Sequence, residues 1–596
     1  MTVAVASPAK AETRSAARVR LGVWMRWLLV AASVVILTLG AVECVYGNTD
    51  SGDVYGSDAV QYLDIARAME RGDWHSALNP LWSQGYPALL AAARPLFTAG
   101  PVGDWRETRV LNCVIFAADY AAFLFLLMGL VSDLRGRARW LVVSAGLMLF
   151  VASQVCLGQV SRVSPDELVS AFFFLACGLI LRWVRAADDR VGRGVVLGLV
   201  LGVGFLVKAV FLLLSCGMLV LLAAALWSRR RSLRPLLAAA VVFAVIAGSY
   251  GTALSRSTGK VTLGEAGAIN YAWHVDRLQK WVHWEGGVEP AAEAWPKPWI
   301  ARFAQWDTRP PEFGLPVHPS VIVQERPRVY GFAAPIHATY VPYFDPPYWY
   351  AGYKHVFGWR YQVIALAKSL GDLVSVLLAL PMFYAVVLAA GILLWGRRRE
   401  GLRSWLREHW AVAACGLLGV AIYLPVHLEG RYLASMLAVI GLCAITAGAA
   451  EVSREKFRVV MAVLALGLFG ALMRTQLPVW RNVLRHKSPM QTVDWKIGQA
   501  VLAARVPARS PVGVVAWTAN LHSDWAYMAQ VEITSETATP EDFDLFWKQD
   551  AAGRRRSLDA FRRAGATVVF SYGKPDGADG VGWTHLGDTP MWMYRL

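Results

Sequence analysis

Four aspartates lie in one short polar stretch of the chain, SGDVYGSDAVQYLDIARAMERGDW, between Ser51 and Trp74. They are Asp53, Asp58, Asp64 and Asp73. A carboxylate at a defined position can act as a general base, which takes a proton from an attacking hydroxyl. It can equally be a solvated loop residue or stabilise the N-terminus of a helix. Residue type alone leaves both interpretations open.

The pair Asp58 and Tyr62 favours a chemical role. Their spacing of four residues puts both side chains on one face of a helix, and the apolar residues of the segment also have helical spacing. The segment directly follows a stretch with the features of a membrane-spanning helix. We therefore expect Asp58 to face a cavity at the level of the membrane surface. The alternative is that Asp58, after Ser57, only stabilises the start of the helix.

Composition identifies the class of protein that must position these residues. The 596 residues are 56% hydrophobic and 17% charged, whereas soluble proteins carry about 25% charged residues. Repeated uncharged runs of about 20 residues predict a polytopic membrane protein. The arginines behind the net charge of +16 fall in short clusters between these runs, which is the positive-inside pattern. We expect membrane lipids as partners and no nucleic acid.

The seven cysteines support neither disulfides nor a metal site. All of them lie within or at the edge of apolar runs, and none occupies a long polar loop. This pattern is typical of small buried apolar side chains rather than of a disulfide framework or a CxxC metal site.

Ten apolar runs predict eleven membrane spans, because one of them is long enough for two. The first ends near Val45, and the arginines ahead of it place an uncleaved N-terminus in the cytoplasm. The run 194–227 is too long for one helix, is interrupted by Lys208 and has arginine clusters at both ends, so we expect a hairpin of two spans. The other runs cover about residues 108–131, 139–158, 166–183, 235–255, 371–395, 409–426, 431–449 and 457–475.

This topology divides the chain into three parts. Residues 1–20 form a cytoplasmic tail, residues 21–475 the transmembrane domain, and residues 476–596 an extracytoplasmic domain. The loops 46–107 and 256–370 are extracytoplasmic as well. Strand-like and helical runs alternate in the C-terminal part, which predicts a small α/β domain, and it has no GxGxxG loop for a nucleotide. The predicted fold class is an α-helical polytopic membrane protein with about eleven spans and this α/β domain.

The stretch SDAVQYLDIARAMERGDW resembles the first-loop motif of the GT-C membrane glycosyltransferases, in the protein mannosyltransferase and aminoarabinose transferase branch. In that motif an aspartate precedes a tyrosine by four residues, and an alanine and a glycine follow. The matching residues are Asp58, Tyr62, Ala66 and Gly72. Ala59 stands where the branch often has a second acidic residue. The resemblance implies that Asp58 is the catalytic base, and we expect Asp53 and Tyr62 to bind substrate.

Three further motifs agree with this resemblance. VSPDELVSAFFFLACGL resembles the family's acidic turn before the fourth span, GLVLGVGFLVKAVFLLL its glycine-rich helix that ends in a lysine, and HLEGRYL its E-x-RY turn before a late span. The corresponding candidates are Asp166 and Glu167; Lys208; and Glu429, Arg431 and Tyr432. The resemblance implies substrate binding for the last four residues. Asp166 and Glu167 would hold a divalent cation, Mg²⁺ or Mn²⁺, or the acceptor.

The charged candidates have structural alternatives. Lys208 and Arg431 lie at predicted outer helix ends, where a lipid phosphate would sit, and an ionised residue at membrane depth is a functional candidate. Lys208 could instead extend to the interface, and Arg431 could form an ion pair with Glu429. Asp166 and Glu167 follow a proline and could be residues of a helix start.

The function implied by the resemblance is glycosyl transfer outside the cell membrane. A bacterial inner-membrane enzyme would move a sugar from a polyprenyl-phosphate donor to an extracytoplasmic glycan, lipid or protein acceptor, with inversion at the anomeric carbon. The reaction needs a base and countercharges for the leaving phosphate, and it requires no cofactor beyond the optional divalent cation.

Two other classes of protein stay open. A transporter or flippase of a lipid-linked substrate is disfavoured because the external loops are large and no pair of similar halves is evident. A non-catalytic scaffold of the cell envelope stays open because Ala59 replaces an acid. The aromatic segment 339–355 could stack on sugars, but a loop of this length needs its own core, so we expect packing.

Overall fold

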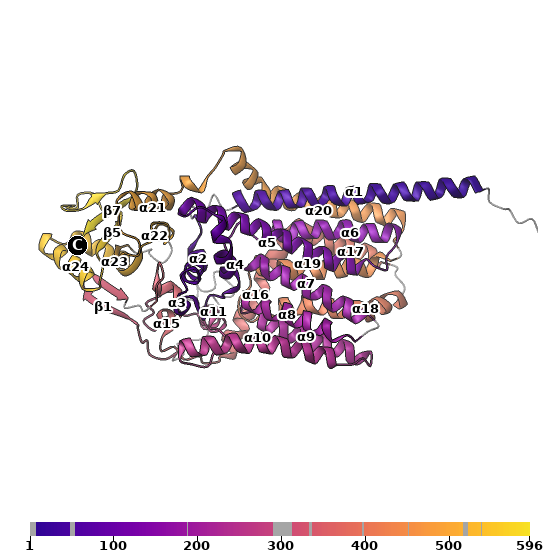
Figure 1. Ribbon diagram of the computed structural model, residues 1–596, viewed down its shortest axis with the longest axis horizontal. Coiled ribbons are helices and arrows are strands. Elements are labelled where there is room, and N and C mark those ends of the chain that lie inside the picture. The colour runs from indigo at the N-terminus through magenta and orange to yellow at the C-terminus, as the bar shows by residue number, and fades with distance from the viewer. Residues whose placement is uncertain are drawn as a thin grey trace, which may run out of the picture.

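The computed structural model describes residues 8–47, 54–186, 189–289, 313–332, 336–395, 399–450, 452–516, 523–537 and 539–596. Long helices lie side by side in a bundle, a mixed sheet lies beyond one end of it, and short helices fill the space between them (Figure 1). Asp53, predicted to bind substrate, lies outside the described residues.

Long apolar helices make up the bundle because each buries its backbone hydrogen bonds within itself. They are α1 (Pro8–Tyr46), α5 (Pro101–Leu130), α6 (Gly136–Phe150), which continues as the π turn Val151–Val155, α7 (Asp166–Arg185), α8 (Val191–Val207), α9 (Phe211–Ser228), α10 (Arg234–Thr258), α16 (Trp359–Ala379), α17 (Pro381–Leu394), α18 (Arg399–Tyr423), α19 (Gly430–Ala449) and α20 (Arg454–Leu484).

Nine helices in the described part of the chain are long and apolar enough to cross a membrane, and α8 and α17 are shorter apolar helices. The chain is therefore a multi-pass membrane protein, as predicted, but the count of eleven spans is not confirmed by length and composition. The predicted run 371–395 is divided between two helices. Pro381 cannot donate a backbone hydrogen bond, and α16 ends just before it while α17 begins on it.

α8 and α9 form the predicted hairpin. The Ser215 hydroxyl of α9 donates to the Leu201 carbonyl of α8 at 3.4 Å. A Cβ on Gly204 would lie 2.5 Å from the ring of Phe211, so only a glycine allows this close approach. Lys208 follows α8 in an extended conformation and starts the turn between the two helices.

The opposite ends of these helices carry the arginine clusters. Arg231 pairs with Asp189, and Arg229 donates to the Arg407 carbonyl, so segments that precede α8, follow α9 and lie in α18 meet there. This arrangement is the one expected if these residues share the cytoplasmic side.

Short helices lie between the bundle and the sheet. They are α2 (Ser57–Glu70), α3 (Trp74–Ala77), α4 (Gly85–Ala93) with the 3₁₀ turn Arg94–Leu96, α11 (Ala266–His274), α14 (Val341–Phe344) and α15 (Pro347–Tyr350). All of them come from the two long loops that were predicted to lie on one side of the membrane.

The sheet has seven strands in the order β1-β2-β4-β3-β5-β7-β6. Its strands are β1 (Ser320–Glu325), β2 (Arg328–Phe332), β3 (Pro511–Val515), β4 (Glu532–Thr537), β5 (Val568–Tyr572), β6 (Thr584–His585) and β7 (Met591–Arg595). β3 pairs in parallel with β4 and β5, and the other pairs are antiparallel. The helices of this region are α21 (Val493–Ala503), α22 (Asp524–Ala529), α23 (Pro540–Lys548) and α24 (Ala551–Arg563), after the 3₁₀ turn Pro489–Gln491.

The sheet is not built by residues 476–596 alone. β1 and β2 come from the loop 256–370, and Tyr330 of β2 pairs with Glu536 of β4. The aromatic residues Tyr340 and Trp349 are buried in the core that also contains Ile533 of β4. The aromatic loop therefore packs against the C-terminal part, as its length predicts, and the two form one structure.

Candidate functional site

The start of helix α2 is held by a residue far along the chain. Gly56 precedes α2 with φ 95°, a left-handed conformation that favours glycine. The Asp524 Oδ2 accepts the backbone N–H groups of Val54, Tyr55 and Gly56 at 2.8, 2.8 and 3.2 Å. These donors precede the helix, where a carboxylate is favourable. The C-terminal region therefore fixes the point at which the helix that bears Asp58 begins.

Asp58 lies in the first turn of α2 and is half-buried. Its Oδ1 accepts a hydrogen bond from the Tyr343 hydroxyl at 2.8 Å. The residue ahead of the helix is Gly56, which has no side chain to cap it. Asp58 thus contacts a side chain of the aromatic loop, in addition to its favourable place near the helix N-terminus.

Tyr62 lies one turn further along α2 and is buried. Its ring packs edge-on against Trp82 at 5.3 Å and Tyr86 at 5.9 Å between centroids. Trp82 and Tyr86 thus pack against the apolar ring of Tyr62, and the hydroxyl is the polar group of this side chain.

Asp166 is the first residue of α7, and its carboxylate contacts two cationic side chains. Lys208 Nζ contacts Asp166 Oδ1, and Arg431 NH1 lies 3.3 Å from Asp166 Oδ2. The side chains of Asp166 and Arg431 are 7% and 9% exposed, while that of Lys208 is 23% exposed. The Asp166 carboxylate thus brings together the motif of Lys208 and the motif of Arg431, which are more than 200 residues apart.

Glu429 also belongs to this group of charged side chains, because it contacts Arg431. Its Oε2 accepts from Arg431 Nε at 2.7 Å, and its Oε1 lies 3.2 Å from His427 Nε2. Burial opposes the charged form, but the hydrogen bond from His427 and the charge of Arg431 hold the pKa of Glu429 below its ordinary value. The predicted pair of Glu429 and Arg431 therefore exists, and Arg431 also contacts Asp166.

Tyr432 packs beneath both cations. Lys208 Nζ lies 4.1 Å from the ring centroid of Tyr432, and Arg431 Cζ lies 4.9 Å from it. Arg431 NH2 also donates to the Tyr432 hydroxyl at 3.1 Å. The electron-rich face of an aromatic ring stabilises a cation without neutralising it, so the two positive groups keep their attraction for an anion.

The hydroxyl of Tyr62 is affected by the charge of Asp58 and by the charges around Arg431. Burial raises the pKa of the Tyr62 hydroxyl well above its ordinary value, the carboxylates of Asp166 and Asp58 raise it further, and Arg431 opposes them. Charges from both motifs therefore act on one buried hydroxyl. The motifs around Asp58, Asp166, Lys208 and Arg431 converge at one end of the bundle.

Asp64 and Asp73, two of the four aspartates between Ser51 and Trp74, accept hydrogen bonds that stabilise the local fold. Asp64 is buried and accepts from the Thr339 N–H at 2.7 Å and the Thr339 hydroxyl at 2.9 Å. Burial raises the pKa of Asp64 to about 6, against the effect of these hydrogen bonds. Asp73 accepts from the Ser76 N–H at 3.2 Å and caps α3.

Glu167 has a different environment from Asp166. It is buried in the bundle near Asp119, and a Cβ on Gly158 would lie 2.4 Å from its Oε1. Within the described ranges, no group of three or more His, Cys, Asp or Glu side chains is arranged to hold a metal ion. Asp166 already contacts two cations, so the residues present do not fit the divalent cation that was expected at Asp166 and Glu167.

Three residues that shape this site belong to none of the sequence motifs. Tyr343 contacts Asp58, Asp524 fixes the start of α2, and His274 stacks on His427 with 3.8 Å between ring centroids. The aromatic run that contains Tyr343 was a signal, but nothing in the sequence connected it to Asp58. Asp524 had no motif around it.

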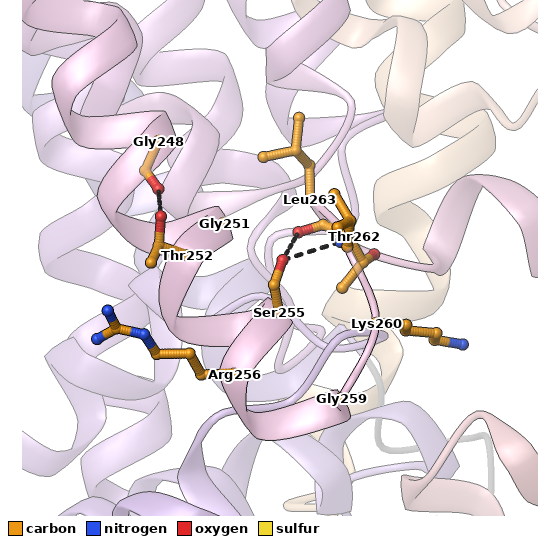
Figure 2. Close-up of a pocket in the computed structure, with 10 residues that line it drawn as sticks. Gly248, Gly251, Thr252, Ser255, Arg256, Gly259, Lys260, Thr262 and Leu263 are labelled. Carbon is orange, nitrogen blue, oxygen red and sulfur yellow. Dashed lines mark hydrogen bonds between the residues drawn. The ribbon is translucent and has the colours of Figure 1, made fainter.

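A surface pocket of about 580 Å³ lies elsewhere, at the end of α10 and the following turn (Figure 2). The Ser255 hydroxyl bonds to the N–H and the carbonyl of Thr262 at 2.9 and 3.1 Å. Lys260 pairs with Glu265 at 2.5 Å. The Ser255 and Lys260 side chains thus have partners in the protein, and the residues that line the pocket include none of the predicted site residues.

Several solved structures are similar to this chain over most of its length. ArnT from Cupriavidus metallidurans bound to undecaprenyl phosphate is 14% identical, covers 95% of this chain and 97% of its own, and gives a TM-score of 0.40. The Archaeoglobus fulgidus oligosaccharyltransferase AglB, in complex with an inhibitory peptide and a dolichol-phosphate, is 9% identical, with coverages of 92% and 70% and a TM-score of 0.43. The arabinofuranosyltransferase AftD from Mycobacteria is 14% identical, with coverages of 92% and 35% and a TM-score of 0.45.

All three are GT-C glycosyltransferases, the family that the motifs of this chain resemble. Because each TM-score is below 0.5, these similarities carry no inference about chemistry. No protein-family model and no curated protein sequence matches the chain.

Proposed function

We propose that this protein is a membrane glycosyltransferase that uses a lipid-phosphate-linked sugar. The observation that carries the proposal is the convergence of a half-buried carboxylate, Asp58, with two cations, Lys208 and Arg431, around Tyr62 and Tyr432. A carboxylate suits the attacking hydroxyl, and the cations suit the leaving phosphate.

The cations are suited to a phosphate because one buried carboxylate holds both of them. Asp166 fixes Lys208 and Arg431 side by side, and Glu429 holds the guanidinium of Arg431 through its Nε. A phosphate that approached them would meet the Lys208 ammonium and the forked guanidinium of Arg431, which binds phosphate well. The two cations lie at the start of α19 and the α8–α9 turn, at the end of the bundle that carries α2. A lipid phosphate at the membrane surface would reach both.

In the proposed reaction Asp58 is the general base. It takes the proton of the acceptor hydroxyl while the hydroxyl oxygen attacks the anomeric carbon. The bond from that carbon to the phosphate oxygen breaks, and its electron pair leaves with the lipid phosphate, next to Lys208 and Arg431. A single displacement inverts the anomeric centre. The hydroxyl of Tyr343 steadies the Asp58 carboxylate through its hydrogen bond.

The remaining assignments belong to this proposal as well. Tyr62, Glu429 and Tyr432 would bind substrate, the acceptor would be an extracytoplasmic glycan, lipid or protein, and the protein would lie in a bacterial inner membrane.

The test is transfer by the purified full-length protein in lipid nanodiscs. Radiolabelled sugars on polyprenyl phosphate are offered together with envelope extract from a deletion strain, and mass spectrometry identifies the envelope glycan that gains the sugar. We expect label in a product that the deletion strain lacks. Donor movement across vesicles without any transfer would instead support a transporter, and neither donor binding nor transfer would support a scaffold.

A further inference from the structure

Three exposed arginines lie in and just after the last three turns of α20. They are Arg474, Arg481 and Arg485. Among the residues that the structure describes, none of their side chains has an ion-pair or hydrogen-bond partner. They lie at the end of α20 opposite to Arg454 and Arg458. Since arginines concentrate on the cytoplasmic side of a membrane protein, three at the other end require an explanation of their own.

Contacts with α1 fix the position of this part of α20. Gln476 Nε2 donates to Glu43 Oε2 at 3.0 Å, and Asn482 Nδ2 donates to the Tyr46 carbonyl at 3.4 Å. The two helices lie side by side at one edge of the bundle (Figure 1). The three arginines take no part in this packing, so the fold alone does not account for them.

A stripe of exposed apolar side chains runs along α20 beside the arginines. Successive members are three or four residues apart and therefore share one face of the helix. They are Leu466, Phe469, Met473, Leu477, Trp480 and Leu484. The stripe begins within a helix that is apolar enough to cross a membrane, so we expect lipid chains to cover it. A tryptophan toward the end of such a stripe is typical of the membrane interface.

The arginines follow this apolar stripe along the helix. Arg474, Arg481 and Arg485 are separated by seven and four residues, which places them on one face as well. Each of them directly follows a residue of the stripe in the sequence. We call these three residues the α20 arginine face. It borders the surface that lipid chains cover.

The length of α20 brings this face to the level of the lipid headgroups. With Arg458 taken as the inner boundary, Arg474 lies about 24 Å and Arg481 about 35 Å further along the helix axis. The hydrocarbon core of a bilayer is about 30 Å thick. An arginine just inside that boundary can extend its guanidinium to the interface. A lipid phosphate would therefore lie between Arg474 and Arg481.

We propose that the α20 arginine face binds the headgroup of an anionic phospholipid in the leaflet next to α2. The guanidinium groups bind the phosphate oxygens, and the apolar stripe contacts the acyl chains. An anionic headgroup supplies the counter-charge that the arginines lack, whereas a zwitterionic headgroup carries a cation of its own. This inference does not depend on the proposed function, because none of these residues belongs to the site around Asp58.

Quenching by brominated lipids measures lipid selectivity at this position. In a background without the seven native cysteines, Met473→Cys carries a bimane label, and the full-length protein is placed in nanodiscs. The nanodiscs contain phosphatidylglycerol and phosphatidylcholine in varied proportions, with one or the other lipid brominated on its acyl chains. Val245→Cys, at an exposed position of α10, reports the lipids at another part of the surface.

We expect phosphatidylglycerol to bind next to residue 473 on the order of fivefold more strongly than phosphatidylcholine, the effect of about one basic residue near a charged surface. The two lipids should quench the label at residue 245 equally. Inorganic phosphate at millimolar concentration should leave the selectivity at residue 473 unchanged, because acyl chains contribute to the binding of the lipid.

Arg474→Gln/Arg481→Gln should remove the selectivity at residue 473. Both side chains are exposed, so the variant should fold as the wild type does. The matched control, Arg135→Gln/Arg137→Gln, removes the same charge from exposed positions at the other end of the bundle. This control should keep the selectivity.

Three results would overturn the inference. They are equal binding of both lipids next to residue 473 in the wild type, an equal preference for phosphatidylglycerol at residue 245, and a preference that survives in Arg474→Gln/Arg481→Gln. Displacement of the lipid by inorganic phosphate would instead identify a site for a soluble anion, and it would contradict the inference as well.

Discussion

The carboxylate of Asp524 accepts the backbone N–H of Tyr55 at 2.8 Å and thereby connects the C-terminal region to the entry of α2. Arg67 of the same helix adds a second connection, since it donates to the Tyr527 carbonyl at 3.0 Å and lies over the Tyr527 ring at 3.5 Å. The helix that carries Asp58 is therefore positioned from outside the bundle.

Asp524→Ala should impair turnover more than donor binding. The substitution leaves three backbone N–H groups without their acceptor, so the start of α2 and Asp58 with it can shift. A misplacement of about 1 Å at a reacting group costs on the order of 10²-fold in rate. We expect kcat to fall toward this limit while KM for the donor, set by Lys208 and Arg431, changes little.

Asp550→Ala is the matched control, because Asp550 caps α24 by accepting from the Gly553 N–H and lies away from α2. It removes a comparable cap and should keep full turnover. Equal losses in both variants, or a change confined to KM for the donor, would show that Asp524 does not position Asp58.

Removal of the cations should separate folding from donor binding. Lys208→Gln or Arg431→Gln leaves Asp166 one partner, so each protein should fold and bind the donor roughly tenfold more weakly. The double variant leaves Asp166 buried without a cation, which costs about 3–5 kcal/mol. We expect its folded yield to fall.

Adding Asp166→Asn to the double variant removes the unpaired charge. Size-exclusion chromatography should then show a folded protein again, and a donor-binding assay should still show no binding. Lys260→Gln serves as the control for loss of a surface lysine. Normal donor affinity in the folded triple variant would rule out the phosphate site.

Asp64 should make stability depend on pH. Its pKa in the folded protein, about 6, is above the ordinary value of 3.8. The folded form therefore takes up a proton more readily than the unfolded chain, and this contribution to stability is present at low pH and is lost as pH rises through about 6. We expect Tm to fall between pH 4.5 and 7 by a component that Asp64→Asn removes.

Differential scanning fluorimetry in detergent measures this component. Asparagine can keep both contacts with Thr339, since its oxygen accepts and its amide group donates. Asp544→Asn, on an exposed face of α23, is the control. The same pH dependence in wild type and Asp64→Asn would contradict the assignment.

The orientation in the membrane can be tested with single cysteines. In a background without the seven native cysteines, we expect Val321→Cys and Pro540→Cys to react with a membrane-impermeant maleimide in intact cells. Arg230→Cys, at the opposite end of the bundle, should react only after lysis. Val321 is used because its neighbour Ser320 is buried. Protection of residues 321 and 540 would place Asp58 in the cytoplasm and remove its external donor.

The sequence predicted those elements that are indicated by a pattern of residues close together in the chain. Apolar runs located the long helices, the spacing of four residues placed Asp58 and Tyr62 on one face of α2, and arginines at both ends of 194–227 predicted the hairpin. Because successive spans alternate in direction, the motifs at Asp166 and Lys208 were expected at one end of the bundle, where the structure brings them into contact.

Contacts between segments that are far apart in the sequence are not indicated by any such local pattern. The pairing of β2 with β4 and the bonds from Asp524 to the start of α2 depend on how the loop and the C-terminal part pack, which no periodicity encodes. The division of the run 371–395 could have been expected from Pro381. The different environments of Asp166 and Glu167, which are adjacent in sequence, depend on the neighbours of each side chain.

Asp58→Asn tests the central claim most directly. Asparagine has nearly the size of aspartate, can still accept the hydrogen bond of Tyr343 and favours helix starts, but it cannot take a proton. Asp73→Asn, in the same loop, is the control because asparagine caps α3 as well as aspartate does. We expect Asp58→Asn to fold and bind the lipid-phosphate donor as the wild type does, and to transfer sugar on the order of 10²–10⁴-fold more slowly, while Asp73→Asn keeps its rate. Full transfer activity in purified Asp58→Asn, or an equal loss in both variants, would contradict the role of Asp58 as the base.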